Sequence, residues 1–132
     1  MKIQQSSIQI NTRRLEETPS FYQEVLGASL VFDCGWYVTF RLPFPGMETD
    51  ISFKTCSEGD VAFEGGLTLN LKVDQVDAVH EQLMSRVRIT TPLEDHPWGD
   101  RGFGFGDPNG LTLYFYHDIK PAKAFEDAYI KA

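Results

Sequence analysis

The fold class is decided by the stretch Gly102-Phe103-Gly104-Phe105-Gly106-Asp107-Pro108-Asn109-Gly110-Leu111-Thr112-Leu113-Tyr114-Phe115-Tyr116. In residues 102–106 glycine alternates with phenylalanine, and in residues 111–116 Leu or Phe alternates with Thr or Tyr. A period of two is that of a β-strand, in which successive side chains point to opposite faces. Between the two ends lies Asp107-Pro108-Asn109-Gly110, in which every residue favours a turn. We therefore predict a β-hairpin with strands at 102–106 and 111–116.

A strand and a helix precede this hairpin. Residues 67–73 alternate between apolar and polar side chains, which predicts a strand. Asp74 is then predicted as the N-cap of a helix. The apolar stripe of this helix is formed by Val76, Val79, Leu83 and Met84. With a further strand at 88–91, the second half of the chain has the order βαβββ.

The first half of the chain has the same order. A strand is predicted at 7–11, followed by a helix with Thr18 as its N-cap and Pro19 in its first position. Gly27 ends this helix. Three more strands are predicted at 29–34, 36–42 and 50–55, and a short C-terminal helix at 121–131. The pattern predicts an α+β protein built from two βαβββ modules.

Composition excludes several classes of partner. The 132 residues suit one domain, and neither a run of about 20 apolar residues nor an apolar N-terminus is present, so no membrane span or secretion signal is expected. A net charge of −7 argues against nucleic acid and anionic membranes as partners. Acidic residues gather between Met47 and Glu64, where they form either a solvated loop or a rim that attracts cationic ligands. Cys34 and Cys56 are expected to be reduced thiols of a cytoplasmic protein.

Several segments resemble one known family. They are the first helix at Leu15–Gly27, the strand Gly35–Phe40, the start of the second helix at Val73–Asp77, and the final hairpin at Pro97–Phe103 with Asp107–Gly110. Over about residues 6–117 the chain resembles the vicinal oxygen chelate superfamily, which includes glyoxalase I, extradiol dioxygenases, fosfomycin-resistance enzymes and bleomycin resistance proteins. The resemblance implies that the two modules form a cup-shaped mixed sheet and that the protein is a homodimer.

The same resemblance gives the domain organisation. It implies a single glyoxalase/bleomycin-resistance-like domain over residues 1–132, with module one at about 6–56, module two at about 66–117 and a C-terminal tail at 118–132.

The resemblance also locates the metal ligands of the family's enzymes. It places them at Ser7, Thr68 and Tyr114, where this chain has no His or Glu. Hydroxyl groups are poor ligands for Zn²⁺, Ni²⁺ or Fe²⁺ beside imidazole and carboxylate. We therefore expect no cofactor, and metal-dependent catalysis is doubtful. The alternative is a displaced divalent-metal site built from His96, His117 and the acidic residues of the 48–64 region.

Strand alternation predicts which side chains face the cup. The residues that alternation places on the cup face are Ser7, Gln9, Tyr37, Thr39, Arg41, Thr68, Asn70, Tyr114 and Tyr116. Trp98 and Arg101 are also expected to line the ligand cavity. If Gly102, Gly104 and Gly106 face the cup, they leave room there for a flat ligand. Two alternatives stay open: Trp98 is a stacking platform or a structural plug, and Arg101 contacts the ligand or pairs with an acid such as Asp107.

Three functions are compatible with these residues. The leading prediction is a metal-independent small-molecule binding protein, which sequesters an antibiotic-like or aromatic ligand in a dimer-interface cavity and thereby provides antibiotic resistance. The second is a glyoxalase-like lyase or dioxygenase with a non-standard divalent metal site. The third is a degenerate module that acts as a regulatory or interaction partner. No catalytic residue is assigned.

Overall fold

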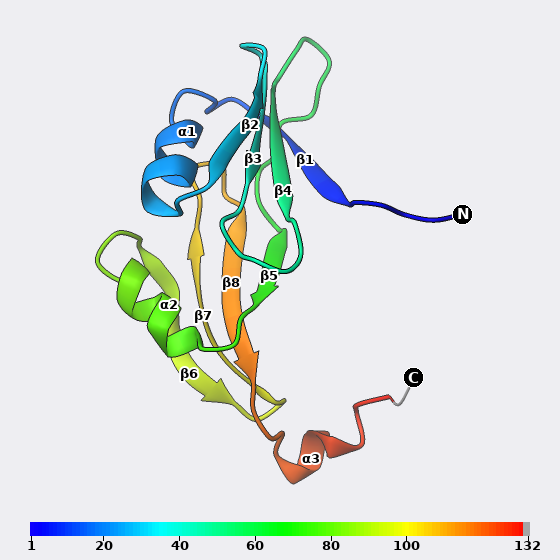
Figure 1. Ribbon diagram of the computed structural model, residues 1–132, viewed down its shortest axis with the longest axis vertical. Coiled ribbons are helices and arrows are strands. Elements are labelled where there is room, and N and C mark those ends of the chain that lie inside the picture. The colour runs from blue at the N-terminus through cyan, green and yellow to red at the C-terminus, as the bar shows by residue number, and fades with distance from the viewer. Residues whose placement is uncertain (131–132) are drawn as a thin grey trace. The chain divides into compact units, whose positions relative to one another are not determined.

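Two four-stranded mixed sheets carry the fold of the computed structural model, which describes residues 1–130 (Figure 1). Each sheet belongs to its own compact unit. Unit 1 consists of Met1–Gly65 together with Asp107–Gly110, and unit 2 consists of Gly66–Gly106 and the chain from Leu111 onward. Both units follow the βαβββ order that the alternation predicts, so the α+β class is confirmed.

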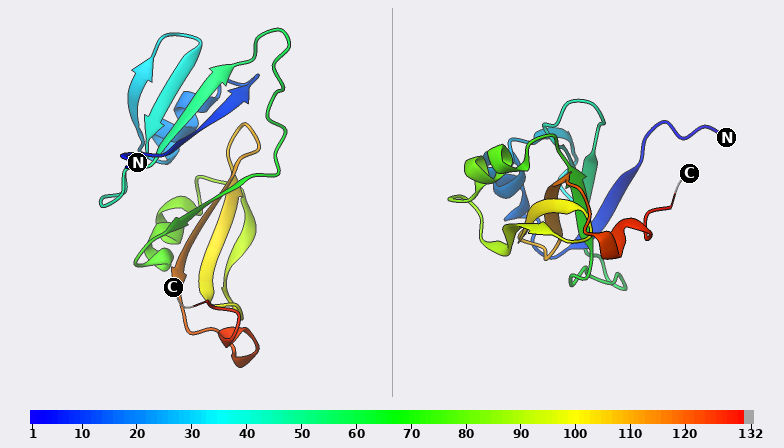
Figure 2. Two further views of the ribbon diagram at one scale, coloured as in Figure 1. Left: turned by 90° about the vertical axis from the view of Figure 1, so that its right-hand side faces the viewer. Right: turned by 90° about the horizontal axis from the view of Figure 1, so that it is seen from below.

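Sheet A of unit 1 has the strand order β1-β4-β3-β2. Its strands are β1 (Ser7–Thr12), β2 (Ser29–Asp33), β3 (Tyr37–Arg41) and β4 (Asp50–Thr55), with β1 parallel to β4 and the other pairs antiparallel. The helical segment α1 (Thr18–Ser20) continues as a π-helical turn, η1 (Phe21–Val25), and covers one face of sheet A (Figure 2). Tyr22 of η1 is fully buried and stacks on Phe40, with 5.3 Å between the ring centroids.

The start of α1 differs from the prediction. Glu17, not Thr18, occupies the N-cap position, and Thr18 is the first helical residue. The Thr18 hydroxyl donates to the carbonyl of Arg14 at 2.8 Å, so it is turned back to the preceding turn and cannot cap the helix. The end of the helix is as predicted, because Gly27 has a φ of +71°, a conformation that glycine adopts without steric cost.

Sheet B of unit 2 has the equivalent order β5-β8-β7-β6. Its elements are β5 (Thr68–Lys72), α2 (Val76–Leu83), β6 (Ile89–His96), β7 (Asp100–Gly106), β8 (Thr112–Asp118) and α3 (Lys123–Glu126). Helix α2 packs on a core in which Phe103, Phe105 and Phe115 are fully buried. Leu113 and Phe115 of β8 point into this core, as the alternation predicts.

Three boundaries in unit 2 were predicted wrongly. Strand β6 continues to His96 instead of ending at Thr91, because it bulges around Pro92 and then pairs again with β7. Gln75, not Asp74, is the N-cap of α2; the backbone N–H of Val76 is instead bound by His117 Nδ1 at 3.1 Å. Helix α3 is confined to Lys123–Glu126, and the predicted end of this helix at residue 131 lies outside the described residues.

The predicted turn at 107–110 belongs to unit 1, where its Asp107 and Asn109 are buried. Tyr22 Oη donates to Asp107 Oδ2 at 2.7 Å, and Asn109 Nδ2 donates to the Thr18 hydroxyl at 3.1 Å. Thr12 of β1 also donates to Asn109 Oδ1. Burial, with the Asp107 carboxylate beside it, raises the pKa of Tyr22, so this phenol stays protonated and acts as a donor. The polar turn is therefore tolerated in the core because its side chains are hydrogen-bonded.

Within residues 1–130, the structure contains no helix that is both long and apolar enough to cross a lipid bilayer.

Candidate functional site

A pocket of about 650 Å³ lies on the face of sheet B that α2 does not cover. All strands of sheet B and the segment after α3 contribute to it. Its lining residues are Thr68, Asn70, Thr91, His96, Trp98, Gly99, Asp100, Tyr114, Tyr116, Asp118 and Tyr129. The volume is within the range of small-molecule sites.

Strand register explains why these side chains meet. Asn70 of β5 pairs with Tyr114 of β8, which pairs with Gly104 of β7. Side chains at paired positions point to the same face, so Asn70 and Tyr114 lie side by side. Two residues further along β8, Tyr116 is on this face as well, and the rings of Tyr114 and Tyr116 stack with their centroids 5.9 Å apart.

A hydrogen-bonded cluster of three side chains lies at one end of this row. His96 Nδ1 is 2.7 Å from Asp100 Oδ1, and Tyr114 Oη lies 3.1 Å from the same oxygen and 3.2 Å from His96 Nδ1. The side chains of His96 and Asp100 are only 11% and 16% exposed. Burial and, next, the hydrogen bond to Asp100 raise the pKa of Tyr114, so its phenol is a donor at neutral pH.

Trp98 extends the row of rings beyond His96. The indole and the imidazole are parallel within 1°, with centroids 4.6 Å apart. Trp98 is 47% exposed, so part of the indole borders the pocket. Its carbonyl accepts a hydrogen bond from Tyr129, which ties the segment after α3 to the turn between β6 and β7. We call Trp98, His96, Tyr114 and Tyr116 the aromatic row.

The space above Gly102 is filled by Tyr114. A Cβ at Gly102 would lie 2.5 Å from Tyr114 Oη and 2.6 Å from Tyr114 Cζ. The prediction that this glycine leaves room for a flat ligand is therefore wrong. The missing side chain instead lets the Tyr114 ring lie down on β7 and reach Asp100.

Five of the predicted cavity residues are brought together by this pocket. They are Thr68, Asn70, Trp98, Tyr114 and Tyr116. Arg101 is placed elsewhere: its guanidinium binds Asp77 of α2 at 2.8 Å and Asp95 of β6 at 3.0 Å. Of the two alternatives for Arg101, pairing with an acid is therefore the one observed, although its partners are Asp77 and Asp95 and the Asp107 carboxylate accepts from Tyr22 instead.

The remaining predicted residues share one face of sheet A in unit 1. They are Ser7, Gln9, Tyr37, Thr39 and Arg41. The Thr39 and Ser52 hydroxyls are hydrogen-bonded at 2.8 Å. Arg41 binds Asp50 through two nitrogens at 2.9 and 3.1 Å and lowers the pKa of that carboxyl. The Arg41 charge is thus already balanced within its own sheet.

Several residues of the pocket were not predicted. They are Thr91, Gly99, Asp100, Asp118 and Tyr129. The one local signal was the spacing of His96 and Asp100 around Pro97-Trp98-Gly99, since a tight turn brings residues four apart face to face.

The histidines proposed for that metal lie on opposite faces of sheet B. His96 lines the pocket, whereas His117 binds the backbone of α2. In the part of the chain that the structure describes, no group of three His, Cys, Asp or Glu side chains is arranged to hold a metal ion.

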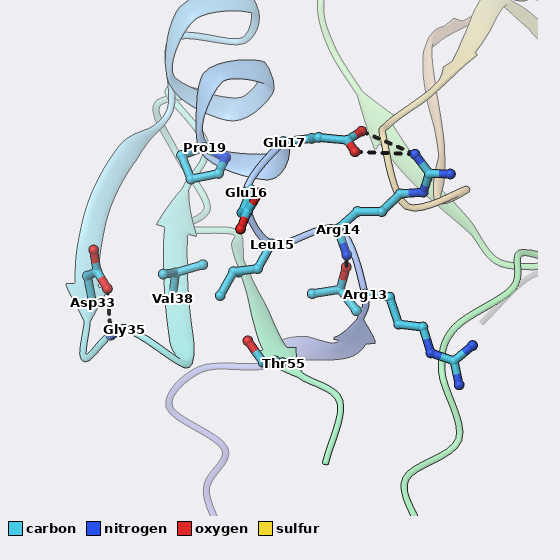
Figure 3. A pocket seen from close by; sticks show the side chains of 11 residues that line it. Arg13, Arg14, Leu15, Glu16, Glu17, Pro19, Asp33, Gly35, Val38 and Thr55 are labelled. Atoms are coloured by element: carbon cyan, nitrogen blue, oxygen red, sulfur yellow. Dashed lines mark hydrogen bonds and ion pairs between the residues drawn. The ribbon is translucent and has the colours of Figure 1, made fainter. Parts of the chain in front are cut away.

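A second pocket, of about 590 Å³, lies in unit 1 where β1 leads into α1 (Figure 3). Arg13, Arg14, Glu16, Glu17 and Asp33 line it. Arg14 reaches Glu17 at 3.2 Å, and Arg13 extends in another direction (Figure 3). Charges of both signs line this pocket and no aromatic ring does, so it offers a ligand less apolar surface than the pocket of unit 2.

The family model of the Glyoxalase/Bleomycin resistance protein/Dioxygenase superfamily matches residues 4–115. The chain belongs to this superfamily. Among solved structures, it is similar to a superfamily member from Sphaerobacter thermophilus DSM 20745, with 28% identity, a TM-score of 0.68 and coverage of 89% of this chain and 99% of that one. The resemblance inferred from the sequence is thereby confirmed.

Two further solved structures share the fold at lower identity. A glyoxalase/bleomycin resistance protein/dioxygenase from Nocardioides has 16% identity and a TM-score of 0.73, over 91% of this chain and 86% of that one. TnmS3, an antibiotic binding protein from Streptomyces sp. CB03234, has 24% identity and a TM-score of 0.68, over 89% and 98% of the two chains. No curated protein sequence matches the chain.

Proposed function

We propose that the protein binds a small aromatic molecule, without a metal ion, in the pocket of sheet B. The observation that carries this proposal is the aromatic row, in which four rings form one side of a pocket of about 650 Å³. Flat apolar ring faces next to the polar groups of Thr68 and Asn70 suit a planar ligand with a few hydrogen-bonding groups.

The biological role that fits such a site is sequestration of an antibiotic-like or other aromatic compound. The neighbour described as an antibiotic binding protein supports this proposal, because it shares the fold. We propose that the protein acts as a homodimer whose second copy closes the pocket, and that it works in the cytoplasm. The free thiols of Cys34, which is exposed, and Cys56 suit a reducing compartment.

Tryptophan fluorescence tests binding, since the chain has two tryptophans and only one lies in the pocket. A Trp36→Phe variant leaves Trp98 as the only indole. Titration of this variant with 4-nitroanisole, a neutral aromatic quencher, is expected to give saturable quenching, with a Kd of roughly 0.1–1 mM for so small a probe.

The matched control is Trp98→Phe, in which the remaining Trp36 lies outside the pocket. The emission of this variant should decrease steadily as the quencher concentration rises, without reaching saturation. Equal, non-saturating quenching of both variants would contradict the proposed site. Native mass spectrometry of protein purified without chelators tests the proposed metal independence and the proposed dimer. One stoichiometric divalent ion per chain would overturn the first, and a monomer would overturn the second.

A further inference from the structure

We propose that His96 and Asp100 form a dyad that takes the proton from an acidic hydroxyl of the bound aromatic ligand, which makes the preferred ligand a phenol. This inference rests on the proposed function, because it assigns the ligand class of the same pocket. It is carried by the accessibility of one histidine nitrogen and by the charges of the lining residues.

The two nitrogens of His96 have different surroundings. Nδ1 faces Asp100 Oδ1 at 2.7 Å, and Tyr114 donates to the same carboxylate. A carboxylate at Nδ1 holds the proton on that nitrogen and leaves Nε2 as the unprotonated acceptor. The proton acceptor of the dyad is therefore Nε2, on the side of the imidazole ring away from Asp100.

His96 Nε2 is accessible. In residues 1–130 every buried side-chain nitrogen or oxygen has a hydrogen-bond partner, and Nε2 makes no hydrogen bond to a described residue. Nε2 is therefore not fully buried, and because His96 is one of the residues that line the pocket of sheet B, we infer that this nitrogen faces the pocket. A ligand lying along the aromatic row can place a hydroxyl group against this nitrogen.

The charges of the pocket select a neutral donor over a preformed anion. The described lining residues include Asp100 and Asp118 but neither lysine nor arginine. Lys72 lies nearby and is bound to Asp118. A carboxylate or phosphate would meet the Asp100 carboxylate, and the nearby Lys72 is already paired with Asp118, whereas a phenol enters uncharged.

Proton transfer then places a positive imidazolium between two negative groups, the phenolate and the Asp100 carboxylate. The ligand O–H bond breaks, its electron pair stays on oxygen as phenolate, and the proton forms an N–H bond at Nε2. The resulting imidazolium lies between the phenolate and Asp100, and its ring face is covered by the Trp98 indole at 4.6 Å. The other titratable groups of the pocket are Asp118, which is paired with Lys72, and the phenols of Tyr114, Tyr116 and Tyr129, of which Tyr114 donates to Asp100.

The test compares 4-nitrophenol with its methyl ether 4-nitroanisole, which has no proton to give. Binding is followed by equilibrium dialysis, and ionisation by the gain in the visible phenolate band upon binding, in neutral buffer, where an imidazole with the ordinary pKa of about 6.5 is largely unprotonated. The wild type is expected to bind the phenol about tenfold more tightly than the ether. It is also expected to show the phenolate band upon binding.

Two substitutions give the matched comparison. His96→Gln keeps a polar side chain of similar size but cannot accept a proton, and is expected to bind both probes equally and to show no phenolate band. His80→Gln alters a histidine that packs edge-on against Phe103, away from the pocket, and should behave as the wild type.

The outcomes separate this inference from the proposed function. Equal binding of both probes by the wild type, or a phenolate band that persists in His96→Gln, would refute the dyad and leave aromatic binding intact. Binding of neither probe would refute both.

Discussion

A single methyl group at Gly102 is expected to disrupt the aromatic row. The φ of Gly102 lies outside the left-handed region, so the backbone there does not itself require glycine. A Cβ would nevertheless lie 2.5 Å from Tyr114 Oη and 2.6 Å from the carbonyl oxygen of Phe115. In Gly102→Ala the Tyr114 ring must leave β7, and the backbone of β8 must shift.

The magnitude follows from what the displaced ring loses. Its hydroxyl gives up contacts with His96 and Asp100, each worth about 0.5–1.5 kcal/mol. Overpacking against the strand costs about 1–3 kcal/mol. The reduced flexibility of the unfolded chain returns about 0.4–1 kcal/mol. We therefore expect the free energy of unfolding to fall by about 1–6 kcal/mol, with a midpoint of about 3 kcal/mol.

Gly104→Ala is the control, because Gly104 lies on the same face of the same strand. Its Cβ would lie 3.4 Å from Tyr114 Cδ1, which is near ordinary contact, and the stability should change by less than about 1 kcal/mol. Urea unfolding followed by circular dichroism gives both values. If the two variants lose the same stability, the close packing of Tyr114 on Gly102 is not what maintains this strand pair.

Two further predictions concern unit 1, and Tyr37→Phe is the control for the first. Tyr22→Phe removes the hydroxyl that binds the Asp107 carboxylate and should lower the free energy of unfolding in urea by about 1.5–3 kcal/mol. Tyr37→Phe removes the hydroxyl of a partly exposed tyrosine and should change this free energy little. Equal losses of stability in the two variants would contradict the role of the buried hydrogen bond. Arg41 lowers the pKa of Asp50 in the folded state, so this carboxylate stabilises the protein above its unfolded pKa of about 3.9 and loses that effect as the pH falls through the lower folded value. Asp50→Asn should therefore flatten the fall of stability below about pH 4, and an unchanged pH profile would refute the linkage.

The faces of the strands were predictable because alternation is a local property. Residues two apart in a strand share a face whatever the strand pairs with, so Thr68, Asn70, Tyr114 and Tyr116 were assigned together before any pairing was known. The prediction that Arg101 lines the cavity did not follow from this rule, because alternation puts Arg101 on the face opposite Gly102, together with Phe103. The direction of the Arg101 side chain is decided by Asp77, a residue on another element.

The tyrosine hydrogen bonds that decide the chemistry of the site join residues far apart in the sequence, so no local sequence pattern shows them. The hydroxyl of Tyr114 reaches a carboxylate 14 residues away, and Tyr22 reaches one 85 residues away. Gly102 looked like an open space because the sequence does not show which ring lies over it.

By itself, the sequence determined the α+β class, the βαβββ order of both halves and the superfamily, since these follow from hydrophobic period, turn residues and segment order. Only the tertiary structure decided that His96, Asp100 and Trp98 join Tyr114 in one site. The physical reason is that strand pairing sets which distant side chains meet, and hydrogen bonding then fixes the direction in which each one points.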